Sequence, residues 1–401
     1  MNQCAALRWY GAGAATARTG DEMSGTALLL AGLAVTGSAA TAASLLAALT
    51  VSAAVGGPVF GALLDRSARP GRLLAGALAG YASGLVIVLV TLGRVPVSVS
   101  VLVALCAGLL GPALSGGWTS QLPRLVPYER LPRANALDAM TFNGASLAGP
   151  ALAGVVAGVV GAPAGVVVAA ALICLALPSA FALPTPRTLA RKPAADLATT
   201  LATDVAAGFR AIVRIGPLAR ATTTSVVSCA GQGMLVACAP LLGAHVFGSP
   251  AHGALLLSGV AVAALTANAV LSARPRPTRP DTVVAYGPLV IAAGLVLAAT
   301  GHPVPVVAAV LLVGIGEGPQ LTALFAIRHR EAPERLRGQI FTTGASLKIT
   351  GFALGAGLAG PLATWSLPGA LLTAAGVQAV ATLWCVVDEA SRRPRDGCAT
   401  G

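Results

Sequence analysis

The stretch that decides the fold is residues 61–93, which read GALLDRSARPGRLLAGALAGYASGLVIVLVTLG. A short polar segment at 65–72 is followed by an apolar run at 73–93 that contains no charged residue. A helix needs about 20 mainly apolar residues to cross the hydrocarbon core of a bilayer. This stretch therefore predicts a membrane-spanning helix preceded by a charged loop.

The same alternation of charged loops and apolar runs extends along the whole chain in both directions. Of the 401 residues, 56% are hydrophobic and 10% are charged, which excludes an ordinary soluble domain and a disordered chain. We expect twelve transmembrane helices, at residues 9–35, 40–64, 73–93, 98–117, 139–161, 163–183, 219–243, 253–273, 282–300, 304–327, 341–363 and 368–387.

These runs predict an all-α membrane protein that consists of two six-helix bundles. The first bundle is expected at residues 1–183, a cytoplasmic linker at 184–218, and the second bundle with a short tail at 219–401. Apolar residues recur at spacings of three and four within the linker, at Leu197, Leu201, Val205, Phe209 and Ile212. This spacing predicts an amphipathic helix that lies on the bilayer surface, and a partner-binding role is the alternative.

The distribution of basic residues predicts the orientation in the membrane. Of the 26 Lys and Arg residues, 22 fall in one alternate set of loops and only Arg94 falls in the other set. Because Lys and Arg are enriched in cytoplasmic loops, both termini are expected to be cytoplasmic, in a bacterial-type cytoplasmic (inner) membrane. The formal net charge of +12 then reflects topology, so the expected partner is the lipid bilayer and no nucleic acid is needed.

Two short echoes indicate that the second bundle repeats the plan of the first. Residues 144–147 and 344–347 both read GASL, and PYERL at 127–131 is echoed by PERL at 333–336. Each echo lies at the approach to, or within, the fifth helix of its half. Parallel six-helix repeats are a known transporter plan with the substrate site at the interface between the halves.

The loop between the second and third runs carries a recognisable motif. Gly61, Asp65, Arg66 and Arg69 resemble the signature of the major facilitator superfamily, although Pro70 and Gly71 depart from the usual end of that motif. We expect a cytoplasmic gate here, because a carboxylate at a helix end can cap the N-terminus of a neighbouring helix and pair with Arg66 or Arg69. The alternative is that the arginines only enforce topology.

The fifth run carries a second partial resemblance. Gly149, Pro150 and Gly154 partly resemble the glycine-proline signature of the exporters of the same superfamily, with Ala153 in place of a glycine. Small residues allow neighbouring helices to approach closely, and a proline bends a helix. This stretch is therefore expected to pack and bend the fifth helix.

Ionisable residues inside the expected spans are candidates for function, since such residues are costly in lipid. Asp21, Glu22 and Glu317 are candidate proton-coupling residues, and Arg18 and Gln232 are candidate cavity-lining residues. The resemblance implies that the first, seventh and tenth helices, which carry them, line a central cavity. Arg18 is expected to reach Asp21 or Glu22 along its own helix. The alternative to proton coupling is a static Arg18–Asp21 pair that fixes helix packing.

The resemblance implies a secondary active transporter rather than an enzyme. We expect proton-coupled export (antiport) of small amphipathic or cationic compounds such as drugs or natural products, by a monomer that binds a small-molecule substrate. No Gly-Lys dipeptide occurs, so there is no Walker A loop, and the proton gradient is the expected energy source without cofactor or metal. The alternatives are a proton-coupled uptake permease and, in another class, a non-transporting membrane receptor or enzyme.

Overall fold

A computed structural model describes residues 3–185, 197–273 and 279–392 of the chain, and the described part is almost entirely helical. The first half contains α1 (Gln3–Thr36), α2 (Ala39–Arg66), α3 (Pro70–Thr91), α4 (Val97–Gly108) with the π-helix η1 (Ala113–Gly117), α5 (Leu131–Val159), α6 (Ala162–Leu175) and α7 (Leu177–Phe181). Two 3₁₀ turns, η2 (Leu122–Arg124) and η3 (Tyr128–Arg130), precede α5. This half holds six of the expected spans, with α4 and η1 forming one span and α6 and α7 another.

The second half has the same number of spans. It contains α9 (Gly216–Phe247), α10 (Ala251–Ala273), α11 (Pro280–Ala299), α12 (Pro303–Glu331), the 3₁₀ turn η4 (Glu334–Leu336), α13 (Arg337–Trp365) and α14 (Leu367–Arg392). Helix α8 (Leu197–Arg214) lies between the halves in sequence. The predicted all-α fold of two six-helix bundles is confirmed, and residues 186–196 of the expected linker lie outside the described residues.

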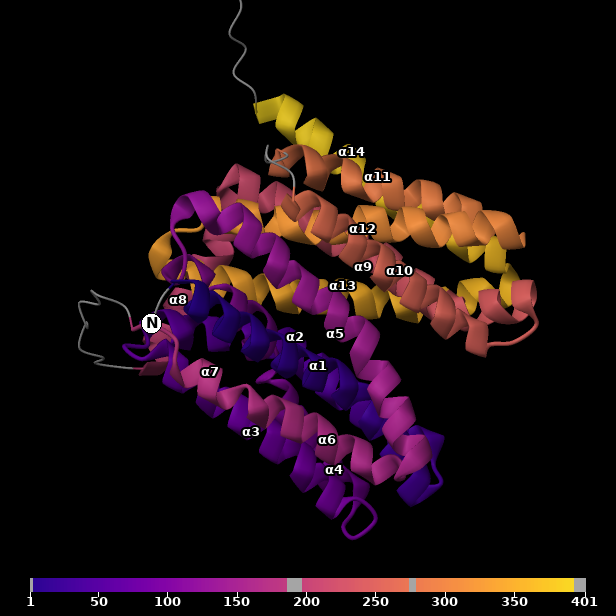
Figure 1. The fold of residues 1–401 in the computed structure, drawn as a ribbon, viewed down its shortest axis with the longest axis horizontal. Coiled ribbons are helices and arrows are strands. Elements are labelled where there is room, and N and C mark those ends of the chain that lie inside the picture. Colours follow the sequence, from indigo (N-terminus) through magenta and orange to yellow (C-terminus); the bar gives the residue numbers. More distant parts are fainter. Residues whose placement is uncertain (1–2, 186–196, 274–278, 393–401) are drawn as a thin grey trace, which may run out of the picture.

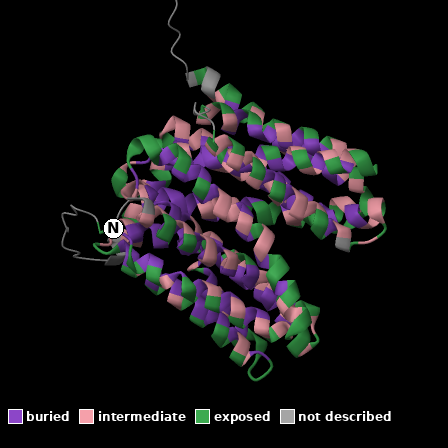
Figure 2. Ribbon diagram, in the orientation of Figure 1, coloured by how far each residue is buried: buried purple, intermediate pink, exposed green. Residues whose placement is uncertain are grey.

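Most of these helices are long and apolar enough to cross a membrane. Among the described residues, 10 helical segments meet that criterion. The remaining two expected spans, α1 and α13, are 34 and 29 residues long and carry ionisable residues in their middle thirds. Exposed residues occur along all the long helices (Figure 2), and many of them are large and apolar, as the surface of a protein in lipid requires.

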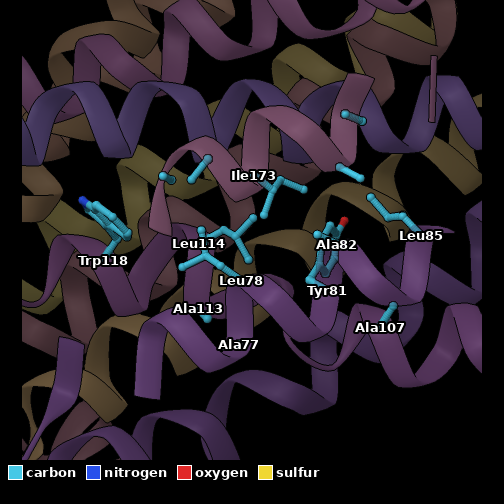
Figure 3. Close-up of a cluster of buried hydrophobic side chains, with 14 of the residues drawn as sticks. Ala77, Leu78, Tyr81, Ala82, Leu85, Ala107, Ala113, Leu114, Trp118 and Ile173 are labelled. Atoms are coloured by element: carbon cyan, nitrogen blue, oxygen red, sulfur yellow. The ribbon is translucent and has the colours of Figure 1, made fainter. Parts of the chain in front are cut away.

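Each half has its own hydrophobic core. The larger core cluster lies entirely between Tyr10 and Leu183, and the second lies between Met234 and Ala375. Figure 3 shows part of the first core, in which Leu78 of α3 lies beside Leu114 and Tyr81 lies further along the same helix. The two largest clusters thus each lie within one half, and a small cluster of Ala139, Phe325 and Phe341 joins the halves.

The two halves contact each other along α2 and α13 and along α5 and α10. The end of the molecule at which α8 also joins this contact is called the linker end. It comprises α8, the C-terminus of α2 and the N-termini of α5 and α13. In Figure 1 the halves lie together on the left, near the N-terminus and α8, and their helices spread apart toward the right. At the opposite end the tight turn at Gly248 has φ 79°, a backbone conformation that favours glycine.

Candidate functional site

The linker end is held closed by a carboxylate that caps a helix of the other half. Asp65, in the last turn of α2, accepts hydrogen bonds from the backbone N–H groups of Gly338 at 2.7 Å and Gln339 at 2.8 Å. These are among the first residues of α13, where N–H groups lack intrahelical acceptors and the helix dipole is positive. Asp65 therefore joins the halves through two charge-assisted hydrogen bonds.

Glycines allow α2 and α13 to approach closely beside this cap. A Cβ built on Gly61 would lie 2.9 Å from the backbone nitrogen of Gln339, closer than real Cβ atoms come. One turn further along α2, Gly57 lies against Thr342 in the same way. Ser346 Oγ then donates to the carbonyl oxygen of Ala53 at 2.6 Å. The closed interface thus extends over several turns and depends on small residues in α2.

The arginines of the expected gate lie elsewhere. Arg66 pairs with Asp204 of α8, and Arg69 is exposed. The arginines whose charges act on Asp65 are Arg124 and Arg337. The expected pairing of Asp65 with Arg66 or Arg69 is therefore wrong, because α8 brings a second carboxylate to Arg66 that the loop sequence does not contain.

Helix α8 packs across the closed end, against α2, α9 and α13 (Figure 1). Gln339 of α13 donates from its side-chain amide to the carbonyl oxygen of Val205 at 3.0 Å, and Ile212 is buried against Leu218 and Ile340. The predicted amphipathic helix is present, and its inner face contacts the helix ends of both halves. Phe209, expected on the apolar face, is partly exposed.

Arg18 is buried inside the first half and is not a cavity-lining residue. Its guanidinium pairs with Asp138 of α5 at 2.8 Å, with both side chains almost fully buried. It also donates to Thr119 Oγ1 at 2.8 Å, and its Cζ lies 3.7 Å from the centroid of the Phe142 ring. The expected pairing of Arg18 with Asp21 or Glu22 is wrong, because Asp138 offers a bidentate partner in a buried site.

The Asp138 carboxylate accepts hydrogen bonds from three residues, Arg18, Tyr10 and Thr119. Tyr10 Oη donates to Asp138 Oδ1 at 2.8 Å, and Thr119 Oγ1 donates to Asp138 Oδ2 at 2.8 Å. Sequence reasoning missed this residue because the fifth span was expected to start at residue 139, whereas α5 starts at Leu131. The sequence does contain an indication of this earlier helix start. Pro132 lies in the first turn of α5, a position that proline favours.

The two acids of α1 lie on different sides of the helix. Asp21 is half-buried and accepts a hydrogen bond from Tyr81 Oη at 2.8 Å. Glu22 is exposed and accepts from Ser146 Oγ of α5 at 3.4 Å. Neither carboxylate has an ion-pair partner among the described residues.

The small residues of α5 differ in what they contact. A Cβ on Gly149 would lie 2.7 Å from Glu22 Cβ, so this glycine brings α5 against α1 beside the Glu22 carboxylate. Pro150 lies inside α5 as expected. Gly154 is exposed, and a Cβ there would meet no described atom within 4 Å, so the expected packing role of Gly154 is wrong.

The second half contains its own set of polar side chains within the spans. Glu317 of α12, Gln232 of α9 and Lys348 of α13 are all half-buried. The Lys348 ammonium acts electrostatically on both Glu317 and the Cys229 thiol, and Cys229 Sγ donates to Gln232 Oε1 at 3.7 Å. No group of three or more His, Cys, Asp or Glu side chains that could hold a metal occurs within the described ranges.

Comparison with known proteins agrees with this architecture. The family model described as "Major Facilitator Superfamily" matches residues 11–347. An uncharacterized MFS-type transporter, y4rN, from Sinorhizobium fredii is 29% identical over 340 residues, which cover 81% of this chain and 77% of the relative.

Solved structures share the fold at low sequence identity. The human organic anion transporter MFSD10 (TETRAN) has a TM-score of 0.74 at 16% identity, covering 94% of this chain and 99% of that chain. A bacterial homologue of the iron transporter ferroportin, in an outward-facing state, has a TM-score of 0.73 at 15% identity, covering 96% and 99%. Together with the family match over most of its length, the two six-helix bundles and the Asp65 cap show that this chain is a membrane transporter of the major facilitator superfamily.

Proposed function

We propose that this protein is a proton-coupled exporter that moves small amphipathic or cationic compounds out of the cell. The excess of basic residues in one set of loops supports a cytoplasmic linker end in a bacterial-type cytoplasmic membrane. With the linker end closed, the conformation described above is then outward-facing. We further propose that the proton gradient drives transport without a cofactor and that the monomer is the functional unit.

The observation that carries the proposal is how the carboxylates inside the spans are partnered. Arg18, the cation nearest in sequence to Asp21 and Glu22, is committed to Asp138. Within the described part of the chain, the Asp21 carboxylate keeps one neutral hydrogen-bond donor, Tyr81, and Glu22 is exposed beside Ser146. An acid in apolar surroundings without a fixed counter-charge exchanges its proton when its surroundings change, which is the property that coupling requires.

A transport cycle follows from this placement. In the outward-facing state the acids of α1 and Glu317 of α12 take up protons from the outside, and bound cargo leaves. Closure of the far end and opening of the linker end expose the same groups to the cytoplasm. The protons are released, and the resulting carboxylates attract a cationic cargo. Gly149 supports export as the direction, since its glycine-proline stretch resembles that of exporters and packs directly against Glu22.

The experiment uses ethidium, an amphipathic cation, as the probe in inside-out vesicles with an acidic lumen. We expect the wild-type protein to accumulate ethidium in the vesicles. Asp21→Asn and Glu317→Gln should each abolish this accumulation, and at least one of the two variants should still exchange ethidium down its concentration gradient. Asp281→Asn is the matched control, because Asp281 pairs with Arg330 near the protein surface, outside the proposed coupling groups. Full pH-driven activity in both variants would contradict the coupling assignment, and cargo movement only in the opposite direction would make the protein an uptake permease.

A further inference from the structure

His329 is a buried histidine that connects the two halves directly. It lies near the C-terminus of α12, is 5% exposed, and packs on the Phe341 ring with centroids 4.5 Å apart. Its Nδ1 lies 2.9 Å from Asn135 Oδ1 of α5, and its Nε2 lies 3.2 Å from the carbonyl oxygen of Thr119. Both partners belong to the first half, whereas His329 belongs to the second.

Thr119 links this histidine to the buried ion pair of the first half. Its hydroxyl donates to Asp138 and accepts from Arg18, while its carbonyl oxygen faces the imidazole of His329. The contact therefore joins α12 to the same short segment that holds the Arg18–Asp138 pair. Separation of the halves at the linker end must break both hydrogen bonds of the ring.

The arrangement restricts the protonation state of the ring. Two oxygen acceptors can be satisfied by an imidazolium that donates twice, or by a neutral ring if the Asn135 amide is turned so that its NH₂ group donates to Nδ1. The charged and titratable groups decide between them. Arg328 of α12 and Arg337 of α13 act on the ring, and Arg18, Tyr10 and Asp138 of the first half lie beyond Thr119.

Three of these groups are cations, and the one carboxylate, Asp138, is already occupied by Arg18, Tyr10 and Thr119. Arg328 is itself 2% exposed, and its Nε and Nη2 atoms have no hydrogen-bond partner among the residues that the structure describes. A further positive charge on the ring would be both desolvated and repelled. These surroundings therefore favour a neutral His329 in the closed linker end.

We propose that His329 is a positioning residue of the transport cycle, a latch whose neutral imidazole holds the linker end closed through Thr119 and Asn135 and whose protonation releases it. A protonated ring is better solvated once the halves separate, so acid shifts the equilibrium toward the open linker end. This property concerns the conformational equilibrium and does not depend on which solute is transported.

The test measures the distance across the linker end by electron spin resonance on a pair of spin labels. Tyr128→Cys and Arg335→Cys, in a variant without the native cysteines, place one label on an exposed site of each half. We expect the population with an open linker end to grow as the pH is lowered from 8 to 5.5. His329→Gln should make this pH-dependent change in the open-to-closed ratio at least fivefold smaller. His302→Gln, at an exposed histidine of the far end, is the matched control and should keep the full change.

Two results would overturn the latch. One is a wild-type distance distribution that does not change with pH, and the other is a His329→Gln variant with the full wild-type change. Asn135→Ala gives a second test if His329→Gln does not fold. It removes one hydrogen bond but keeps the titratable ring, so it must raise the open population already at pH 8, and an unchanged population there would also reject the proposal.

Discussion

Replacing Asp65 by Asn should open the linker end. The carboxylate accepts two backbone N–H groups at the start of α13, at 2.7 and 2.8 Å. Asn keeps one acceptor oxygen, loses the charge, and turns an NH₂ group toward the second N–H. A hydrogen bond to a charged group contributes about 1.5–3 kcal/mol, and the helix dipole about 0.3–1 kcal/mol. We therefore expect the closed state to lose about 2–3 kcal/mol, which at about 1.4 kcal/mol per factor of ten is a shift of about 30- to 140-fold.

The shift can be measured by thiol labelling at a buried contact between the halves. Ala139 of α5 is fully buried with Phe325 and Phe341 of the second half, so Ala139→Cys in a variant without other cysteines reports separation at the linker end. We expect Asp65→Asn to raise its labelling rate by the factor above. A cysteine at Tyr128, which is 69% exposed, should label equally fast in both backgrounds.

Asp204→Asn is the matched comparison for this experiment. It removes a carboxylate from the same end of the molecule, where it pairs with Arg66 in a half-exposed site. Such pairs contribute about 0–1 kcal/mol, so the labelling rate should change less than about fivefold. If Asp65→Asn labels no faster than Asp204→Asn, the cap does not hold the halves together and the reasoning fails.

Three further variants test the close helix contact, the buried ion pair and the role of the cysteines. Gly61→Val should prevent closure of the linker end and give fast labelling at Ala139→Cys, because even a Cβ overlaps the backbone of Gln339; slow labelling would contradict the close approach. Asp138→Asn should destabilise the first half by about 3–5 kcal/mol, since it leaves the buried Arg18 charge uncompensated, and a thermal melt in detergent that matches wild type would contradict this. A variant with Ala or Ser at all seven cysteines should keep most transport activity, because lone cysteines in apolar helices behave as small hydrophobes; loss of transport in a variant that reaches the membrane would disprove it.

The fold could be predicted from the sequence because the bilayer imposes strong constraints. Each span must satisfy its backbone hydrogen bonds internally, so apolar runs of sufficient length identify helices directly. Helix ends were harder to locate. The fifth span begins at Leu131 and α12 continues to Glu331, so Asn135, Asp138 and His329 are helical residues although they lie outside the apolar runs.

The candidate site was only partly predictable. The motif around Asp65 indicates a capping carboxylate. The arginines that act on this carboxylate are Arg124 and Arg337, which are distant from it in sequence. Arg18 illustrates the same limit. Residues three and four positions away are the natural partners on an isolated helix, whereas the actual partner, Asp138, is 120 positions away on α5. Pairings between helices depend on rotation and depth, which periodicity in one helix does not encode.

Proton movement during transport tests the central claim most directly. Inside-out vesicles that contain the protein are acidified inside, and the pH gradient is followed with a fluorescent amine dye such as ACMA, which is quenched as the lumen becomes acidic. The proposed exporter predicts that added ethidium enters the vesicles in exchange for protons, so that the dye fluorescence recovers in the wild type and not in Glu317→Gln. Ethidium accumulation without any recovery of fluorescence, or no response in wild-type vesicles that hold a stable gradient, would contradict proton-coupled export.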